Sequence, residues 1–284
     1  MNKNIGLVLE GGSLRGIFTS GVLDFFLEKG IHFDYVVGVS AGTCNMLGYI
    51  AKRKGYIKDR MIVKDKEDRF FGFYQLRKEG KIVNLDKIFF ENPEGEEPYD
   101  YEDFFNSGVD WEMVVTNVET GQPEYLHEDK SARRLANIAK ASCSLPGITR
   151  DLKIGRKIYS DGGSGDSIPL KRSIDKGHTK NVVICTRQEG HFPKLSAVLK
   201  KYYKTRYKNN PEFLNTLLNR GKMYKEQSAF LNEEVEKGNA FVIRPTIKEV
   251  KRMEKDYDKL LAFYKNGYEE AQKAYDALME FLES

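Results

Sequence analysis

One short segment constrains this chain more than any other: residues 38–42, with the sequence G-V-S-A-G. The pattern G-x-S-x-G is typical of a serine held on a sharp turn between a strand and a helix, with its hydroxyl exposed at the end of a sheet. A short apolar strand precedes the segment, and 41–53 follows with apolar residues at helical spacing. Gly38 and Gly42 keep side chains out of a turn that is too tight for a Cβ. Ser40 is therefore predicted to be a nucleophile at a helix N-terminus, where the helix dipole stabilises developing negative charge.

A second glycine-rich turn, residues 10–16 with the sequence E-G-G-S-L-R-G, lies between an apolar strand at 5–9 and a helix at 17–29. Glycines at such a junction free backbone N–H groups to bind an anion. A serine that transfers an acyl group needs these donors for its oxyanion, and loss of one donor costs ~10²–10³ in rate. Arg15 opposes the helix dipole in the first turn, which suggests that it is kept for an anionic group.

The base that accepts the serine proton is predicted to be a carboxylate. The segment Asp161-Gly162-Gly163 follows an expected hairpin at 152–160, and a carboxylate can act as base when burial raises its affinity for the proton. The serine turn follows the second strand, which is too early for the order of elements in an α/β-hydrolase. The four histidines are expected to be structural: His32, His127, His178 and His191.

Taken in order, these three blocks resemble the motifs of the patatin-like phospholipases, over roughly residues 5–190. Members of that family are acyl hydrolases with a Ser–Asp dyad and no catalytic histidine, on a three-layer α/β/α fold with a mostly parallel central sheet. The resemblance implies that Ser40 is the nucleophile and Asp161 the base. It also implies an oxyanion loop and a supporting set of residues. The loop is Gly11, Gly12 and Ser13, and the supporting residues are Arg15, Gly38, Gly42, Gly162 and Gly163.

The glycine loop departs from the family pattern at two positions. Ser13 stands where a third glycine is usual, and Glu10 stands where aspartate is common. The backbone N–H survives at Ser13, but a Cβ restricts any conformation with positive φ. The segment 141–146, A-S-C-S-L-P, resembles the family's small-residue segment that ends in proline.

The composition is that of a soluble globular protein, with 40% hydrophobic and 31% charged residues. No apolar run approaches the ~20 residues of a membrane span, and the N-terminus leads directly into the first strand, so no signal peptide is expected. The cysteines, at 44, 143 and 185, lack metal-ligand spacing. A cytoplasmic protein that requires no metal or organic cofactor is expected.

Two regions are expected along the chain. Residues 1–193 should form the patatin-like catalytic α/β domain, and 194–284 a basic, mostly helical region that contributes one further strand at about 240–244. Within the first region, 55–107 has few strand signals and many aromatic residues. These residues are interpreted either as core or as the wall or lid of an acyl pocket.

The net charge of +4 conceals a local excess of positive charge in 194–225. Nine Lys or Arg and one acid give this segment +8, and the rest of the chain, with 37 basic and 41 acidic residues, has −4. A solvated helix face is the simpler interpretation. The alternative is peripheral contact with an anionic membrane or attraction of an anionic substrate, since a basic amphipathic helix can lie at a lipid surface. Nucleic acid is the least favoured partner.

The C-terminal segment 261–282 repeats apolar residues at steps of three and four, the spacing of a coiled-coil seam. A helix docked on its own domain has the same pattern. Docking is favoured over a homodimer formed through this helix.

The sequence thus predicts a serine hydrolase for carboxylic esters of lipids, of the phospholipase A type. Two alternatives are kept. One is a soluble carboxylesterase for short or non-lipid acyl groups, and the other is a non-catalytic lipid-binding protein with the same fold.

Overall fold

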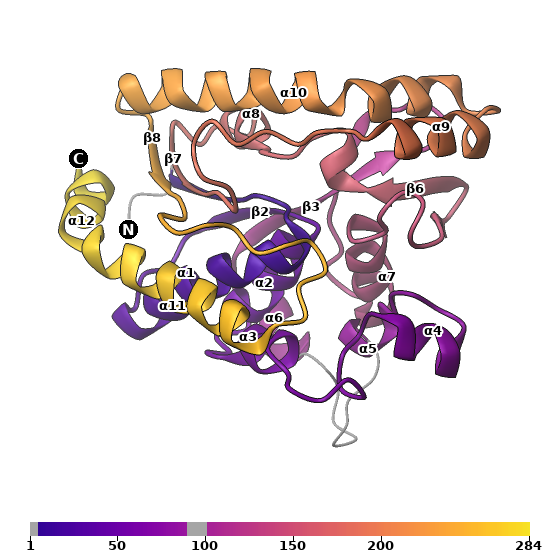
Figure 1. Cartoon of the computed structure of the whole chain (residues 1–284). Helices are drawn as coiled ribbons and strands as arrows, with labels where there is room; N and C mark the ends of the chain where they lie inside the picture. The colour runs from indigo at the N-terminus through magenta and orange to yellow at the C-terminus, as the bar shows by residue number, and fades with distance from the viewer. Residues whose placement is uncertain (1–4, 90–100) are drawn as a thin grey trace.

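An eight-stranded sheet forms the centre of the molecule, in the order β5-β6-β3-β2-β1-β7-β8 with β4 paired to β3 (Figure 1). The computed structural model describes residues 5–89 and 101–284. Neighbours from β3 to β8 along this order pair in parallel, whereas the pairs β3–β4, β3–β6 and β5–β6 are antiparallel. The strands are β1 (Ile5–Leu9), β2 (Tyr35–Val39), β3 (Asp110–Asn117), β4 (Pro123–Leu126), β5 (Leu152–Ile154), β6 (Lys157–Asp161), β7 (Lys180–Ile184) and β8 (Ala240–Ile243).

Helices cover both faces of this sheet, with α8 and α10 on one side and α1, α2 and α11 on the other (Figure 1). The α helices are α1 (Gly16–Lys29), α2 (Ala41–Ile50), α3 (Tyr56–Met61), α4 (Phe73–Glu79), α5 (Asp86–Phe89), α6 (Tyr101–Phe105), α7 (Ala132–Ser142), α8 (Leu170–Asp175), α9 (Ala197–Arg206), α10 (Pro211–Glu236), α11 (Tyr257–Lys273) and α12 (Tyr275–Glu283). Two short 3-10 helices are η1 (Ser13–Arg15) and η2 (Gly162–Ser164). The expected α/β class and the three-layer α/β/α arrangement with a mostly parallel sheet are confirmed.

The layers follow from strands that are buried on both faces, as parallel strands between helical layers are. In β1, Leu7 and Leu9 pack into the core beneath α1, whereas Val8 points to the opposite core beneath α8 and α10. All three side chains are fully buried. Because helices cover both faces of these strands, a polar site open to solvent is expected in the loops at their carboxyl ends.

The segment 55–107 was expected to form either part of the core or the wall of an acyl pocket, and its side chains do both. Phe89 and Phe104 are buried in the main core, and other side chains between α3 and α5 line a pocket described below. Residues 92–98, whose composition predicts a loop, lie outside the described residues. The helix after the serine ends at Ile50 rather than at residue 53, because the backbone turns into the left-handed region at Lys52 (φ 57°).

The C-terminal seam packs on α1 of the same chain (Figure 1). A Cβ on Gly21 would lie 2.1 Å from the carbonyl oxygen of Tyr264, and one on Gly267 would lie 2.0 Å from that of Phe18. Both positions therefore require glycine, which lets the two helix backbones approach closely. Tyr264 also donates a hydrogen bond to Asp24 of α1 at 2.8 Å.

Among residues 5–89 and 101–284, no helix combines the length and the apolar character that crossing a membrane would require.

Candidate active site

Ser40 lies on the turn between β2 and α2, with its backbone in the left-handed region at φ 53° and ψ −117°. A conformation of this kind costs a non-glycine residue about 1–3 kcal/mol and persists where the surroundings enforce it. Here the Ser40 N–H donates to Ser142 Oγ at 2.9 Å, and Thr43 Oγ1 donates to the Gly38 carbonyl at 3.0 Å. A Cβ on Gly42 would lie 2.4 Å from the carbonyl oxygen of Leu9. The expected sharp strand-to-helix turn is present.

Asp161, the last residue of β6, accepts a hydrogen bond from Ser40 Oγ at its Oδ2 atom, at 2.7 Å. Its other oxygen, Oδ1, accepts from the Gly163 N–H at 2.9 Å. Burial raises the pKa of this carboxyl above its usual value, while the hydrogen bond from Ser40 and the charge of Arg220 act in the opposite direction. The pair therefore consists of a hydroxyl donor and a buried acceptor whose affinity for a proton is increased.

The sheet register brings these two residues together from 121 positions apart. Val39, the residue before Ser40, is opposite Val114 in β3, and Asp161 is opposite Val115, the next residue of β3. Gly162 continues past β3 so closely that a Cβ there would lie 2.1 Å from the Val114 carbonyl oxygen.

The segment 141–146 positions both members of the pair. Ser142 Oγ accepts from the Ser40 N–H, and the Ser144 carbonyl accepts from the Asp161 N–H at 2.8 Å. This positioning role explains why small polar residues stand there. The sequence motif marked the segment but did not assign these contacts.

The glycine loop lies directly against Ser40. A Cβ on Gly11 would fall 3.3 Å from the Ser40 Cβ, and Ser13 lines the same pocket as Ser40. Within the described part of the chain, no group accepts a hydrogen bond from the N–H of Gly11, Gly12 or Ser13. The loop thus leaves backbone donors unpaired beside the serine, as an oxyanion site requires.

Ser13, which stands where the family usually has a third glycine, adopts a backbone conformation that glycine favours. Ser13 is one of three non-glycine residues with positive φ in the described chain, at 52°. The loop is held in this conformation by bonds around it: the Leu14 N–H donates to the Arg252 carbonyl at 3.4 Å, and buried Glu10 accepts from Thr186 N–H and Tyr224. Serine therefore tolerates a backbone that usually favours glycine.

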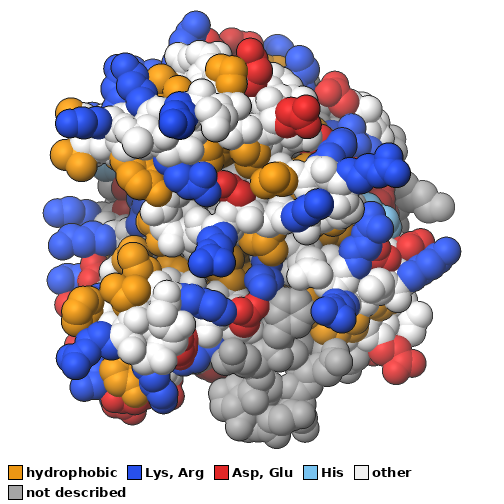
Figure 2. All heavy atoms as spheres, turned by 90° about the vertical axis from the view of Figure 1, so that its right-hand side faces the viewer, with side chains coloured by type: hydrophobic (Ala, Val, Ile, Leu, Met, Phe, Trp, Pro, Cys, Tyr) orange, Lys and Arg blue, Asp and Glu red, His pale blue; other side chains and the backbone are white. Residues whose placement is uncertain are grey.

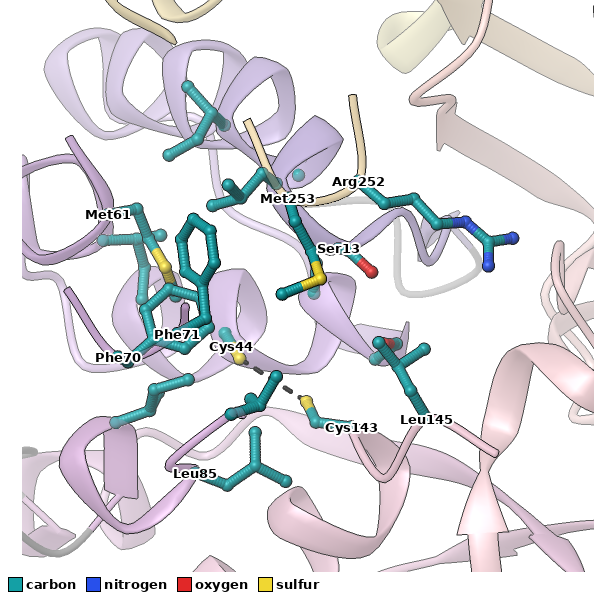
Figure 3. A pocket seen from close by; sticks show the side chains of 18 of the residues that line it. Ser13, Cys44, Met61, Phe70, Phe71, Leu85, Cys143, Leu145, Arg252 and Met253 are labelled. Atoms are coloured by element: carbon teal, nitrogen blue, oxygen red, sulfur yellow. Dashed lines mark hydrogen bonds between the residues drawn. The ribbon is translucent and has the colours of Figure 1, made fainter. Parts of the chain in front are cut away.

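An apolar pocket opens beside Ser40 (Figure 3). Its walls come from η1 and α1, from the 55–107 segment and from the connection between β8 and α11. The apolar side chains that line it include Leu14, Ile17, Ile57, Met61, Phe70, Phe71, Val83, Leu85, Ile88, Leu145 and Met253. A linear hydrocarbon chain fits such a lining, because burial of each CH₂ is worth about 0.8 kcal/mol.

The arrangement of Ser40, Asp161 and the glycine loop has a counterpart among known proteins. The model of the family "Patatin-like phospholipase" matches residues 7–173, more than half of the chain. This chain belongs to the patatin-like phospholipase family. At the level of the family, the activity is that of a lipid acyl hydrolase. A second model, a domain of unknown function (DUF6363), matches residues 210–283 of this patatin-like chain.

One curated relative and one solved structure extend the comparison. The uncharacterized protein YjjU of Escherichia coli K12 is 31% identical over 187 residues, which are 64% of this chain and 52% of that protein. The chain thus spans about half the length of this relative. The crystal structure of VipD from Legionella pneumophila has a TM-score of 0.50 at 17% identity, and the match covers 97% of this chain and 67% of that one. This likeness concerns the fold.

The four histidines lie elsewhere in this patatin-like fold, and none bonds to Ser40 or Asp161 in the described chain. His127 Nδ1 contacts the Trp111 carbonyl, His178 stacks on Tyr35, His191 Nδ1 contacts Glu249, and His32 lies near Tyr49.

Sequence reasoning missed several residues of the site. Cys44 and Cys143 line the apolar pocket with their sulfurs 3.7 Å apart (Figure 3), and the hydrogen bond between them and burial raise the pKa of Cys143.

Arg15, predicted to serve an anionic group, is buried. Arg220 and Arg252 approach the site from the C-terminal region. Only their position in the folded chain identifies them: Arg220 lies in the basic segment 194–225, interpreted as a solvated helix face, and Arg252 belongs to no motif of the sequence.

Proposed function

We propose that this protein hydrolyses carboxylic esters of lipids, with Ser40 as nucleophile and Asp161 as general base. The observation that supports it best is the 2.7 Å hydrogen bond from Ser40 Oγ to a buried Asp161, next to unpaired backbone N–H groups and an apolar pocket. A serine needs a base within ~2.6–3.2 Å to become a nucleophile.

The proposed reaction has two halves. Ser40 Oγ attacks the ester carbonyl as its proton passes to Asp161 Oδ2, and the oxyanion accepts hydrogen bonds from the loop at 11–13. The tetrahedral intermediate collapses, and Asp161 returns the proton to the departing alcohol. Water then gives its proton to Asp161 and attacks the acyl-enzyme, and the carboxylic acid leaves as Ser40 regains a proton.

The test is the initial rate on p-nitrophenyl esters from two to sixteen carbons. Because the pocket beside Ser40 is lined by apolar side chains, kcat/KM is expected to rise with chain length and to peak at long chains. Ser40→Ala serves as the blank at each length. An optimum at two to four carbons would instead favour the soluble esterase, and the absence of Ser40-dependent rate at every length would favour the binding protein.

A further part of this proposal is that α9 contacts an anionic membrane. Val198 is 81% exposed and Tyr202 42% exposed on α9, and Lys200, Lys201 and Lys204 accompany them. Figure 2 faces this side of the molecule and shows hydrophobic side chains scattered among Lys and Arg. Insertion of exposed apolar side chains into the lipid favours binding. Each nearby cation contributes a further ~1 kcal/mol to the free energy of binding to anionic lipid.

Val198→Asp is expected to weaken binding to phosphatidylglycerol vesicles about tenfold, because it removes an inserting side chain and adds a repelled charge. Vesicle sedimentation at low and high salt measures this. Val235→Asp is the matched control, since Val235 is 42% exposed at the far end of α10. Equal binding to neutral and anionic vesicles, unaffected by salt, would rule out the contact.

A further inference from the structure

A second cavity meets the apolar pocket at the Ser40–Asp161 pair. Ser40 lines the apolar pocket and Asp161 lines the second cavity, while Leu145 and Arg252 line both. An ester bound at Ser40 has an acyl chain on one side of its carbonyl and an alcohol part on the other. If the chain occupies the apolar pocket, the alcohol part extends toward the second cavity.

The second cavity carries three basic residues in a lining that is otherwise largely apolar. These are Lys194, Arg220 and Arg252, and Asp161 is the single acid of the lining. Against the effect of burial, which raises the pKa of Asp161, the charges of Arg220 and Arg252 act to lower it. Arg220 comes from α10, where its Nε donates to the Gly163 carbonyl at 2.6 Å. Figure 3 shows the Arg252 guanidinium pointing away from the apolar side chains. Two arginines thus reach the alcohol side of the site from outside the segment that matches the patatin-like family.

Two more arginines lie behind this cavity and add to its positive charge. Arg15 and Arg187 are each only 8% exposed. In the described chain, no carboxylate oxygen lies within 4.0 Å of a guanidinium nitrogen of Arg15, Arg187, Arg220 or Arg252. Burial first and neighbouring arginines second lower the pKa of Arg15 and of Arg252 to about 10.

The acids near these arginines are engaged in other bonds. Glu10 accepts from the Thr186 N–H and from Tyr224, and Glu249 accepts from the Gln188 N–H and contacts His191. Arg15 and Arg187 are buried, and Arg220 and Arg252 are half-buried. Such a cluster of cations without ion pairs is costly unless an anion joins it. Guanidinium groups bind phosphate through parallel N–H donors, and this makes arginine the residue of choice for phosphate.

We propose that Arg220 and Arg252 form a subsite for a phosphate on the alcohol part of the ester, and so select phosphate-bearing acyl esters over neutral ones. This proposal rests on the proposed function at Ser40. The C-terminal region, whose matching domain has no known function, thereby supplies substrate selection to the catalytic domain.

The test uses two substrates that differ only in the phosphate: 1-oleoylglycerol and 1-oleoylglycerol 3-phosphate, each dispersed in the same neutral detergent micelles. The wild-type protein is expected to favour the phosphate ester in kcat/KM. Arg252→Gln and Arg220→Gln are each expected to reduce that preference at least roughly tenfold, because a charge-assisted hydrogen bond is lost. The readout is the ratio of kcat/KM for the two substrates. An effect of either variant on Asp161 changes both values equally and therefore cancels in this ratio.

Arg133→Gln, at an exposed site on α7, is the matched control and should keep the wild-type ratio. Arg252→Lys should retain part of the preference, because it keeps the charge but loses the guanidinium fork. An unchanged ratio in both Arg220→Gln and Arg252→Gln would overturn the subsite even if hydrolysis depends on Ser40.

A binding measurement separates this inference from the proposed function. Calorimetry on the Ser40→Ala protein with the ether lipid 1-O-hexadecylglycerol 3-phosphate and its neutral counterpart needs no turnover. Tighter binding of the phosphate ether, lost in a Ser40→Ala/Arg252→Gln double variant, supports the subsite even if no ester is hydrolysed. Equal affinity for the two ethers refutes the subsite and leaves the role of Ser40 to the rate measurements.

Discussion

Ser40→Ala is expected to abolish formation of an acyl-enzyme and to lower ester hydrolysis by at least roughly 10³-fold. The substitution removes the hydroxyl that donates to Asp161 at 2.7 Å. The oxygen of that hydroxyl is the atom proposed to bond to the acyl carbon. The unpaired N–H groups of the glycine loop stay in place, so the variant still binds the ester. Mass spectrometry after exposure to a fluorophosphonate, which labels activated serines, measures the loss directly as an absent adduct.

Ser13→Gly is the control for this experiment. Ser13 is the other serine in the same pocket, and its φ of 52° is one that glycine adopts without strain. The variant is expected to carry the fluorophosphonate adduct as the wild type does. An adduct on the Ser40→Ala protein would show that the nucleophile is misassigned.

The parts of the site that the sequence predicted are those set by local backbone chemistry. The strand-to-helix turn at Ser40 and the glycine loop each need a few adjacent residues of fixed type, and a short motif records them. The base was predicted for the same reason, since Asp161 and the two glycines after it stand on one hairpin end. A parallel sheet with crossover helices was predicted from apolar strands that alternate with helical segments, and the three α/β/α layers were predicted from the resemblance to the patatin-like family.

The residues that the sequence did not predict are those that reach the site only through tertiary packing. Arg252 lies on the connection between β8 and α11, which crosses to the glycine loop and receives a hydrogen bond from the Leu14 N–H. Arg220 lies in a segment whose charge suggested a surface, yet it bonds to the Gly163 carbonyl. Cys44 and Cys143 likewise meet across 99 residues. No local pattern encodes such contacts, because they depend on how distant elements close over one another.

Asp161→Asn is expected to lower kcat by about 10²–10⁴-fold, the usual contribution of a general base. The amide keeps the size of the carboxylate, and its oxygen can still accept from the Gly163 N–H. In place of Oδ2, however, it presents an NH₂ group to Ser40, which cannot take the serine proton. The fold should be retained, and the variant should unfold at no lower temperature than the wild type at neutral pH, because burial disfavours the charged carboxylate it replaces.

The pH dependence provides the second half of this prediction. Asp161 has a raised pKa in the folded protein and must be ionised to act as base. The wild-type kcat/KM should therefore rise with pH through that raised pKa, while the contribution of Asp161 to the free energy of unfolding falls over the interval from its ordinary to its raised pKa. Rate profiles and thermal melts across this range should show both trends in the wild type. In Asp161→Asn the rise in rate should be absent and the fall in stability smaller but still present, because other carboxyls, among them Glu10 and Asp166, also have raised pKa values in the folded protein. Near-normal rates in Asp161→Asn, together with a loss of activity in a histidine variant such as His127→Gln, would assign the base to the histidine instead.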